Sequence, residues 1–442
     1  MSKTREQIYA EELASLIRLE TVSNEKQKDL SKFHAFHELL KSTFPALFGA
    51  AEYCERNGSF YLRWKGSEEL PPIMLMNHHD VVEASGDWKY PPFSGTVADG
   101  KVWGRGTLDT KGGLWSMLRA ANELAEEGFT PKRDIYFTST CNEECSGAGA
   151  LSIANELKEK GIRFAAVLDE GGMIIKEPIP GAEGEFAMIG VGEKGCADIK
   201  FIARSNGGHA STPEKNTPLV RLGKFMAAVE SKQLFEAKIS PTVEKMFSGI
   251  SEHMTGYMKL ILGNSRKFAP VLAKILPSVS PAAGAMVQTT IAFTMAGGSE
   301  GANVLPNEAW VVGNMRYSHH QGGKASIKAI TDLAKKYGIE TVVLDPGTES
   351  PITDYNADPF KLTEKAVKTI FPNVCALPYI MNGASDSSYM SVICDNCLRF
   401  TPFTIDNEQL DSIHASNENI AVSALPKAVD FYKYFITEAQ AL

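Results

Sequence analysis

The sequence predicts an α/β protein in which a central mixed sheet is flanked by helices and carries an inserted α+β unit. The chain has 442 residues, enough for two or three domains of about 100–200 residues each. Three short apolar runs, near 73–76, 134–140 and 164–168, each lead into histidine or carboxylate residues. Such runs are typical of buried strands whose carboxyl ends carry the active site of an open α/β sheet. From about residue 197 a different order of strands and helices begins, which predicts the second unit.

The composition indicates a globular protein that does not bind nucleic acid. Hydrophobic residues make up 43% of the chain and charged residues 22%, which is ordinary for globular domains. The formal net charge is -8, and no block of lysine and arginine offers the basic patch that phosphate binding requires. Residues 1–7 lack the apolar segment of a signal peptide, so we expect a cytoplasmic protein.

Neither the cysteines nor the uncharged segment 275–299 indicates a disulfide framework or a membrane span. The seven cysteines have no regular spacing, and the pair Cys394-x-x-Cys397 has no second pair with which to form a structural zinc site. Pro277, Pro281 and several glycines interrupt the uncharged segment, so we expect a loop that leads into a strand rather than an apolar helix. We therefore expect no membrane partner.

The first part of the chain leads to a possible metal-ligand motif. We expect helices near 6–18 and 31–42, followed by strands near 60–64 and 73–76. The second of these strands runs into Asn77-His78-His79-Asp80. A His-x-Asp sequence by itself fits an ordinary polar turn as well as a functional site, so its meaning depends on what the other strands carry.

A glycine-rich loop, 99–113, precedes the next predicted helix. Its glycines prevent a long regular element, so we expect a shaped loop. Asp109 lies at its end, just before an apolar helical stripe that includes Leu114, Leu118 and Leu124. An aspartate in this place is commonly a helix N-cap, whereas the surrounding glycines favour a backbone that bends around a ligand.

Carboxylates accumulate at the ends of the next two strands. Glu143 and Glu144 follow one strand, Asp169 and Glu170 follow the other, and His414 precedes the last predicted helix. Buried adjacent carboxylates cost several kcal/mol unless a cation or hydrogen bonds compensate. Oxygen ligands mixed with imidazole suit zinc, manganese or cobalt. The ligands exceed the need of one tetrahedral ion, so the sequence predicts two metal ions about 3.5–4 Å apart.

With these motifs the sequence resembles a known family, the dinuclear zinc hydrolases that include aminoacylase, carboxypeptidase S, carboxypeptidase G and related deacylases. The resemblance covers nearly the whole chain and is strongest to the carboxypeptidase S branch. It rests on the following motifs in the expected order: His78-His79-Asp80-Val81-Val82, Gly104-Arg105-Gly106 with Asp109 and Lys111-Gly112-Gly113, Glu143-Glu144, Asp169-Glu170-Gly171, Gly208-His209-Ala210-Ser211, Asn303-Val304-Leu305-Pro306, and His414 with Glu418.

The resemblance implies two zinc ions per subunit, which cobalt or manganese could replace. His78 and Glu170 would hold one ion, and Glu144 and His414 would hold the other. Asp109 would bridge the two ions.

The resemblance also implies two residues that act beside the metal ions. Asp80 would fix the tautomer of His78 through a hydrogen bond. Glu143 would be the general base, because a carboxylate that binds no metal is the better base. Asp169 is a less favoured candidate for a metal ligand.

Further roles fall in the inserted unit, which the family uses as a lid and dimerisation domain. His209 would cross a homodimer interface and donate to the developing oxyanion in the partner's site, and Asn303 would be a second such donor. Arg316 would grip the free carboxylate of the substrate, with help from the backbone at Gly383. Without the resemblance, Arg316 would read as a solvated arginine at a strand edge, and Asp386 has no assigned role.

The lid has its own order of expected elements, βαββαβ, which is ferredoxin-like. We expect the lid at 196–348 and the catalytic domain at 1–195 and 349–442. A stretch near 233–284 is extra to the pattern. It could cap a hydrophobic substrate, pack a dimer, touch a membrane surface or add packing within the lid. The expected elements are strands near 197–205, 289–296, 309–317 and 340–344, with helices near 219–231 and 324–337.

The sequence therefore predicts a dinuclear zinc amide hydrolase that releases an amino acid with a free carboxylate. A carboxypeptidase or dipeptidase that acts on di- or short peptides is the first hypothesis. An N-acyl-amino-acid deacylase of the same mechanism is the alternative. A catalytically silent binding protein is a third hypothesis, which the intact ligand set and Glu143 disfavour.

Overall fold

The apolar runs of the sequence form neighbouring parallel strands at the centre of a large mixed sheet. The computed structural model describes residues 3–279 and 281–442, and over these residues the sheet has ten strands. They are, along the sheet, β1 (Glu52–Arg56), β2 (Ser59–Trp64), β6 (Ile135–Thr140), β3 (Ile73–His78), β7 (Ala166–Asp169), β17 (Cys397–Arg399), β9 (Glu185–Glu193), β8 (Ile174–Lys176) and β18 (Thr404–Ile405), with β16 (Val374–Met381) paired to β9. β3 pairs in parallel with both β6 and β7, so the three carboxyl ends share one edge.

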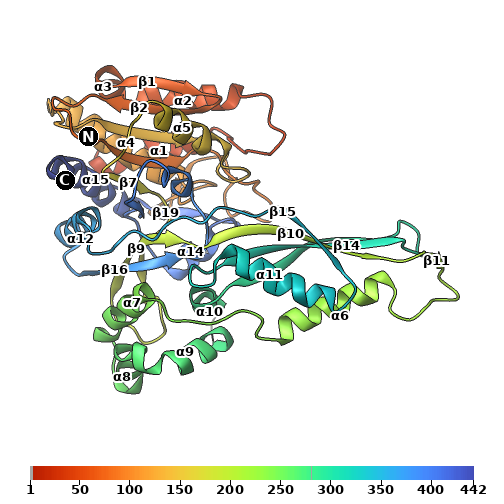
Figure 1. Cartoon of the computed structure of the whole chain (residues 1–442). Helices are drawn as coiled ribbons and strands as arrows, with labels where there is room; N and C mark the ends of the chain where they lie inside the picture. The colour runs from red at the N-terminus through yellow and green to blue at the C-terminus, as the bar shows by residue number, and fades with distance from the viewer. Residues whose placement is uncertain (1–2, 280) are drawn as a thin grey trace.

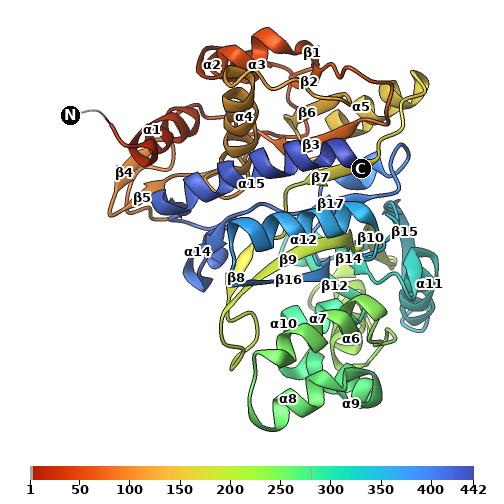
Figure 2. The ribbon, with the colours of Figure 1, turned by 90° about the vertical axis from the view of Figure 1, so that its left-hand side faces the viewer.

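Side chains alternate along β3 and divide the core into two layers. Ile73 and Leu75 enter one apolar cluster, and Met74 and Met76 enter another, as the two-residue period of a strand requires. Helices cover both layers, and Figure 2 shows α15 and α12 side by side across one of them. The first layer is covered by α1 (Arg5–Ile17), α2 (Ser31–Thr43), α3 (Pro45–Ala50), α4 (Lys111–Glu126), α12 (Asp358–Ile370) and α15 (Leu425–Glu438), and the second by α5 (Ala148–Glu159) and α13 (Ser387–Met390).

A small sheet ties the glycine-rich loop to the end of the chain. Arg105 donates to the buried carboxylate of Glu418 at 2.8 Å, and the backbone N–H groups of Leu108 and Asp109 donate to the same carboxylate at 2.8 and 3.1 Å. This network holds Asp109 beside the segment that carries His414. The elements around it are β4 (Thr96–Ala98), β5 (Lys101–Trp103), β19 (Asn419–Ala421), α14 (Asn407–Ser412) and the short 3₁₀ helix η1 (Val422–Ala424), while η2 (Ala439–Ala441) ends the chain.

The inserted unit, called the lid below after its expected role, is a four-stranded antiparallel sheet that extends away from the rest of the chain (Figure 1). Its strands are β10 (Gly195–Arg204), β12 (Thr290–Gly297), β14 (Glu308–Tyr317) and β15 (Glu340–Asp345), and its helices are α6 (Pro218–Ser231) and α11 (Gly322–Lys335). The spatial order β12-β14-β10-β15 is ferredoxin-like. A two-stranded ribbon, β11 (Gly208–His209) with β13 (Val304–Leu305), lies at the far end of the lid (Figure 1). A mixed sheet flanked by helices, as the sequence predicted, is thus confirmed.

The extra stretch between α6 and β12 forms four helices that pack on the large sheet rather than within the lid. They are α7 (Pro241–Glu252), α8 (Gly256–Gly263), α9 (Ser265–Val279) and α10 (Pro281–Val287). Val243 and Phe247 of α7 share an apolar cluster with Phe186 of β9 and Leu377 of β16. This cluster places the four helices beside the end of the large sheet (Figure 2).

We expected a loop over the start of the uncharged segment 275–299. This expectation is wrong, because residues 275–279 and 281–287 are helical. Pro281 occupies the first turn of α10, where proline costs no helical hydrogen bond. Pro277 lies near the end of α9, and burial of Leu272 and Val287 in the same apolar cluster offsets the low helix propensity. The strand expected to follow is present as β12.

Two other expectations concern what the chain lacks. All seven cysteines are free thiols. None of the described helices combines the length and the apolar character needed to cross a bilayer.

Candidate active site

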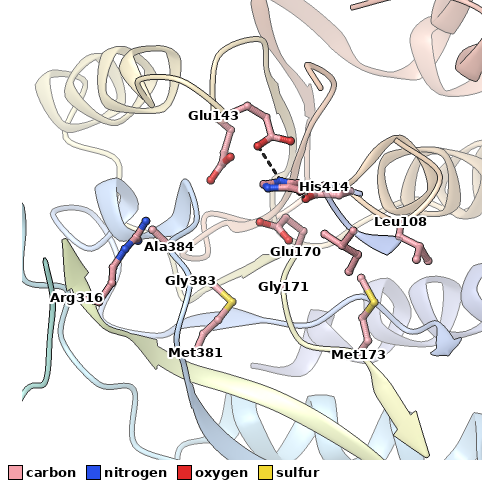
Figure 3. A pocket seen from close by; sticks show the side chains of 13 residues that line it. Leu108, Glu143, Glu170, Gly171, Met173, Arg316, Met381, Gly383, Ala384 and His414 are labelled. Atoms are coloured by element: carbon pink, nitrogen blue, oxygen red, sulfur yellow. Dashed lines mark ion pairs between the residues drawn. The ribbon is translucent and has the colours of Figure 1, made fainter. Parts of the chain in front are cut away.

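A cavity of about 430 Å³ opens at the carboxyl edge of β3, β6 and β7. It is walled by loops of the body, by the end of β14 and by the segment after β16 (Figure 3). Segments far apart in the sequence therefore meet at one place. The predicted site residues that line the cavity are Asp109, Glu143, Glu144, Glu170, Arg316, Gly383 and His414.

Asp109 lies between the two predicted histidine ligands. Its Oδ1 is 3.0 Å from Nε2 of His78, and its Oδ2 is 3.0 Å from Nε2 of His414. Burial raises the pKa of Asp109, but the hydrogen bonds from His414 and His78 outweigh this and lower it below its usual range. Asp109 is not a helix N-cap, because Thr110 holds that position in α4.

Asp80 orients more of the site than the sequence predicted. Nδ1 of His78 lies 2.9 Å from the backbone carbonyl oxygen of Asp80 and 3.5 Å from its carboxylate. A carbonyl oxygen only accepts, so Nδ1 carries the proton and Nε2 faces Asp109. The carboxylate of Asp80 accepts from the backbone N–H groups of Glu143 and Glu144, at 3.2 Å each. Asp80 thus positions the glutamate pair as well as the histidine.

The two glutamates of the pair have different surroundings. Oε2 of Glu144 is 3.2 Å from Nε2 of His414, and its Oε1 is buried without a hydrogen-bond partner in the described part of the chain. Glu143 approaches Nε2 of His78 only to 4.0 Å. Burial and, less strongly, the charges of nearby carboxylates raise the pKa of Glu143 well above its usual range. A raised pKa suits a group that accepts and returns a proton.

Asp169 and Glu170 have different surroundings. Asp169 contacts backbone N–H groups, whereas Glu170 lines the cavity. The carboxylate of Asp169 accepts from the backbone N–H groups of Glu170 and Ser387, at 2.9 and 2.7 Å. Both of its oxygens are therefore occupied by the protein. Glu170 lines the cavity (Figure 3), where burial raises its pKa well above the usual range.

Asp386, which had no assigned role, is buried and does not line this cavity. It accepts a hydrogen bond from the hydroxyl of Thr140. Burial and the charge of Asp169 raise the pKa of Asp386 to about 7. It adds negative charge near Glu143.

The residues around Asp109 fit a metal site. One ligand atom each from His78, Asp109 and Glu144 lie within 4.8 Å of one another. Imidazole and carboxylate donors without thiolate suit zinc and similar divalent ions. The unpaired Oε1 of Glu144 has the character of a ligand atom, because a buried carboxylate oxygen normally has a partner.

Arg316 and Gly383 lie in the cavity wall. The Nε of Arg316 donates to Asn314 Oδ1 at 3.1 Å, whereas its Nη1 is buried without a partner among the described residues. A Cβ added at Gly383 would meet no atom within 4 Å, so the backbone there is open to the cavity. Figure 3 shows Arg316 on one side of Glu170 and Met173 on the other.

His78 and Asp80 do not line this cavity themselves but contact Asp109 and the glutamate pair, which do. His209 and Asn303 do not line it either. They lie in the ribbon at the far end of the lid (Figure 1), where the backbone N–H of Ala210 donates to the carbonyl of Asn303 at 3.0 Å. His209 is exposed, and its Nδ1 accepts from the hydroxyl of Ser211 at 2.8 Å.

An apolar cavity of about 370 Å³ adjoins the first one. Apart from Gly383, the sequence did not predict the residues that line it, because they come from separate segments. The apolar character of the extra stretch had only suggested that this stretch could cap a hydrophobic substrate. The two cavities share Gly171, Met173, Met381, Gly383 and Ile413, and the four helices add Met246, Ile250, Ala282 and Met286 to the apolar one.

Known proteins resemble this chain over nearly its whole length. Residues 74–438 match the model of peptidase family M20/M25/M40. Probable carboxypeptidase S-like 2 of Dictyostelium discoideum is 30% identical over 453 residues, which cover 98% of this chain and 85% of that protein. The N-fatty-acyl-amino acid synthase/hydrolase PM20D1 of Homo sapiens is 29% identical over 448 residues, which cover 99% and 89%.

A solved structure shares the fold. The M20 family metallo-carboxypeptidase Sso-CP2 from Sulfolobus solfataricus matches with a TM-score of 0.72 at 17% identity, over 98% of this chain and 99% of that chain. The resemblance inferred from the motifs is confirmed, because the family model spans most of the chain. The protein is a hydrolase that belongs to peptidase family M20/M25/M40.

Proposed function

We propose that the protein hydrolyses the amide bond of N-acyl amino acids that have a free carboxylate and a bulky apolar acyl group. The apolar cavity that joins the catalytic cavity carries this proposal. Arg316 on one side of Glu170 suits the carboxylate, and Met173 on the other side, which lines both cavities, leads to the apolar one. The human relative is named an N-fatty-acyl-amino acid synthase/hydrolase, and this name supports the same substrate class.

A carboxypeptidase or dipeptidase that acts on short peptides is the second candidate. The names of the carboxypeptidase S-like relatives favour it. In that case the apolar cavity would take an apolar residue of the peptide.

We propose two zinc ions at the site. His78 and Glu170 would hold one ion, Glu144 and His414 would hold the other, and Asp109 would contact both. The position of Asp109 between the two histidines supports this arrangement. Zinc bound by these residues would polarise the amide carbonyl and lower the pKa of a water molecule.

The protein's own groups then orient the substrate and move one proton. Arg316 holds the substrate carboxylate through its N–H groups. Glu143 takes a proton from the attacking water as the oxygen adds to the carbonyl carbon. When the C–N bond breaks, Glu143 returns this proton to the leaving nitrogen. The products are the carboxylic acid of the acyl group, which ionises by losing the second proton of the water, and a free amino acid.

We propose further that His209 and Asn303 act in the cavity of a second subunit, since neither lines the cavity of its own chain. If so, dimers that combine His209→Ala subunits with Glu143→Gln subunits contain one intact site. We expect such mixed dimers to regain part of the wild-type turnover, measured against each mutant alone. The absence of any gain in purified mixed dimers would contradict action across the interface.

The substrate class is tested with a matched panel after zinc reconstitution. The panel contains N-acyl amino acids, unblocked dipeptides and the C-terminal amides of both. We expect the free acids with long acyl groups to react best, and Arg316→Ala to lower their kcat/KM about 10–100-fold, as the loss of charged hydrogen bonds predicts. Their amides should change little. The control is Arg163→Ala, an exposed arginine of the body, and equal losses for acids and amides would exclude the proposed contact.

Glu143→Gln should keep the metal ions but lower kcat about 10²–10⁴-fold, because glutamine cannot accept the proton of water. Metal content is measured by elemental analysis and kcat by product release. Glu159→Gln, an exposed change on α5, serves as the control. Turnover near the wild-type value in Glu143→Gln would remove Glu143 from the reaction.

Met286→Trp should fill part of the apolar cavity that α10 walls. We expect kcat/KM for a long N-acyl substrate to fall about tenfold or more, because a few methylenes lose their apolar contacts. The N-acetyl analogue, which is too short to reach the cavity, should react as before. Met226→Trp in the lid is the matched control. A uniform loss across acyl lengths would show that this cavity does not take the acyl group.

A further inference from the structure

The outer surface of α8 and α9 exposes large apolar side chains. The exposed fractions are 75% for Tyr257, 63% for Leu260, 55% for Val271 and 48% for Ile275. Single exposed apolar residues are common, whereas several on two consecutive helices form a patch of the kind that marks an interaction site. The two helices lie at the outer end of the insertion (Figure 2).

α9 has two distinct long faces. Leu272 and Ala273 are buried, which fixes α9 against the protein. Phe268, Val271 and Ile275 recur at spacings of three and four residues, so they lie along one face of the helix, and all three are exposed. The apolar stripe is therefore an outward surface of a helix that is already anchored on its other side.

The same two helices carry four cations that have no acidic partner among the described residues. Lys259, Arg266, Lys267 and Lys274 are exposed, and residues 253–299 contain no aspartate or glutamate. None of the four forms an ion pair within the part of the chain that the structure describes. In a protein of formal charge -8, this surface is locally positive.

We propose that α8 and α9 dock the protein on an anionic lipid surface. Apolar side chains on such helices enter the boundary between headgroups and acyl chains, while lysine stems reach back to the negative headgroups. Each lysine near an anionic bilayer adds attraction. A second copy of the chain fits less well, because a symmetric interface would bring like charges together.

The sequence predicted no membrane partner for the protein as a whole, but it left contact with a membrane surface open as one role of the extra stretch near 233–284. A docked helix lies in the plane of the bilayer surface, so it needs no helix that crosses the membrane. The same group of helices walls the apolar cavity through Met246 and Met286. If the proposed function holds, an acyl substrate dissolved in lipid would be hydrolysed near its source, but the docking itself does not require that function.

The test is cosedimentation of the zinc-loaded protein with vesicles. We expect binding to vesicles of phosphatidylcholine mixed with phosphatidylserine, little binding to phosphatidylcholine alone, and loss of binding in concentrated salt, which screens the attraction. The triple variant Lys259→Glu, Lys267→Glu and Lys274→Glu should weaken binding about tenfold or more. The matched control reverses three exposed lysines on or next to α11 of the lid, Lys324, Lys335 and Lys336.

The apolar part of the surface is tested separately. Val271→Ser with Ile275→Ser should lower vesicle binding while the protein keeps its hydrolysis of a short water-soluble substrate, because neither residue lines a catalytic wall. Equal binding of both triple variants would overturn the proposal. So would self-association of the wild type without lipid that Val271→Ser with Ile275→Ser abolishes, since the surface would then join two copies.

Discussion

Negative charge concentrated at one edge of the sheet is the constraint on which the site depends. Parallel pairing of β6, β3 and β7 brings their carboxyl ends together, and each end carries acidic residues. Carboxylates buried side by side repel each other and lose hydration, so each needs a donor or a cation. Some of these carboxylates accept hydrogen bonds from the protein and support the site, whereas Glu144, which faces the cavity, keeps an oxygen without a partner among the described residues.

Some carboxylates are satisfied by the protein itself. Asp169 accepts two backbone N–H groups, and Asp80 accepts those of the glutamate pair. Glu418 accepts from Arg105 and from the loop that carries Asp109. These carboxylates build the frame, whereas Glu144 keeps a buried oxygen that no protein group occupies among the described residues.

The four helices of the insertion have an inner side next to the apolar cavity and an outer side that faces solvent. Their inner residues complete the apolar cavity next to the carboxylates, and their outer residues form the basic and apolar surface of α8 and α9. A change in these helices could therefore alter substrate choice and docking without touching the catalytic edge. The lid sheet is separate from this layer, because its own apolar cluster is built from β10, β14, α6 and α11.

The sequence by itself determined the family and the mixed α/β class, because strand ends and glycine-rich loops leave local patterns that can be read in order. The resemblance to the family, rather than any local pattern, pointed to Arg316 and Gly383, which line the cavity. Tertiary structure alone decided the rest. It placed the helices of 241–287 on the body rather than in the lid, since that choice depends on the apolar surface of β9 and β16. It also gave Asp80 its contacts with the glutamate pair and put His209 outside the cavity of its own chain, because no local pattern records which distant backbone groups will meet.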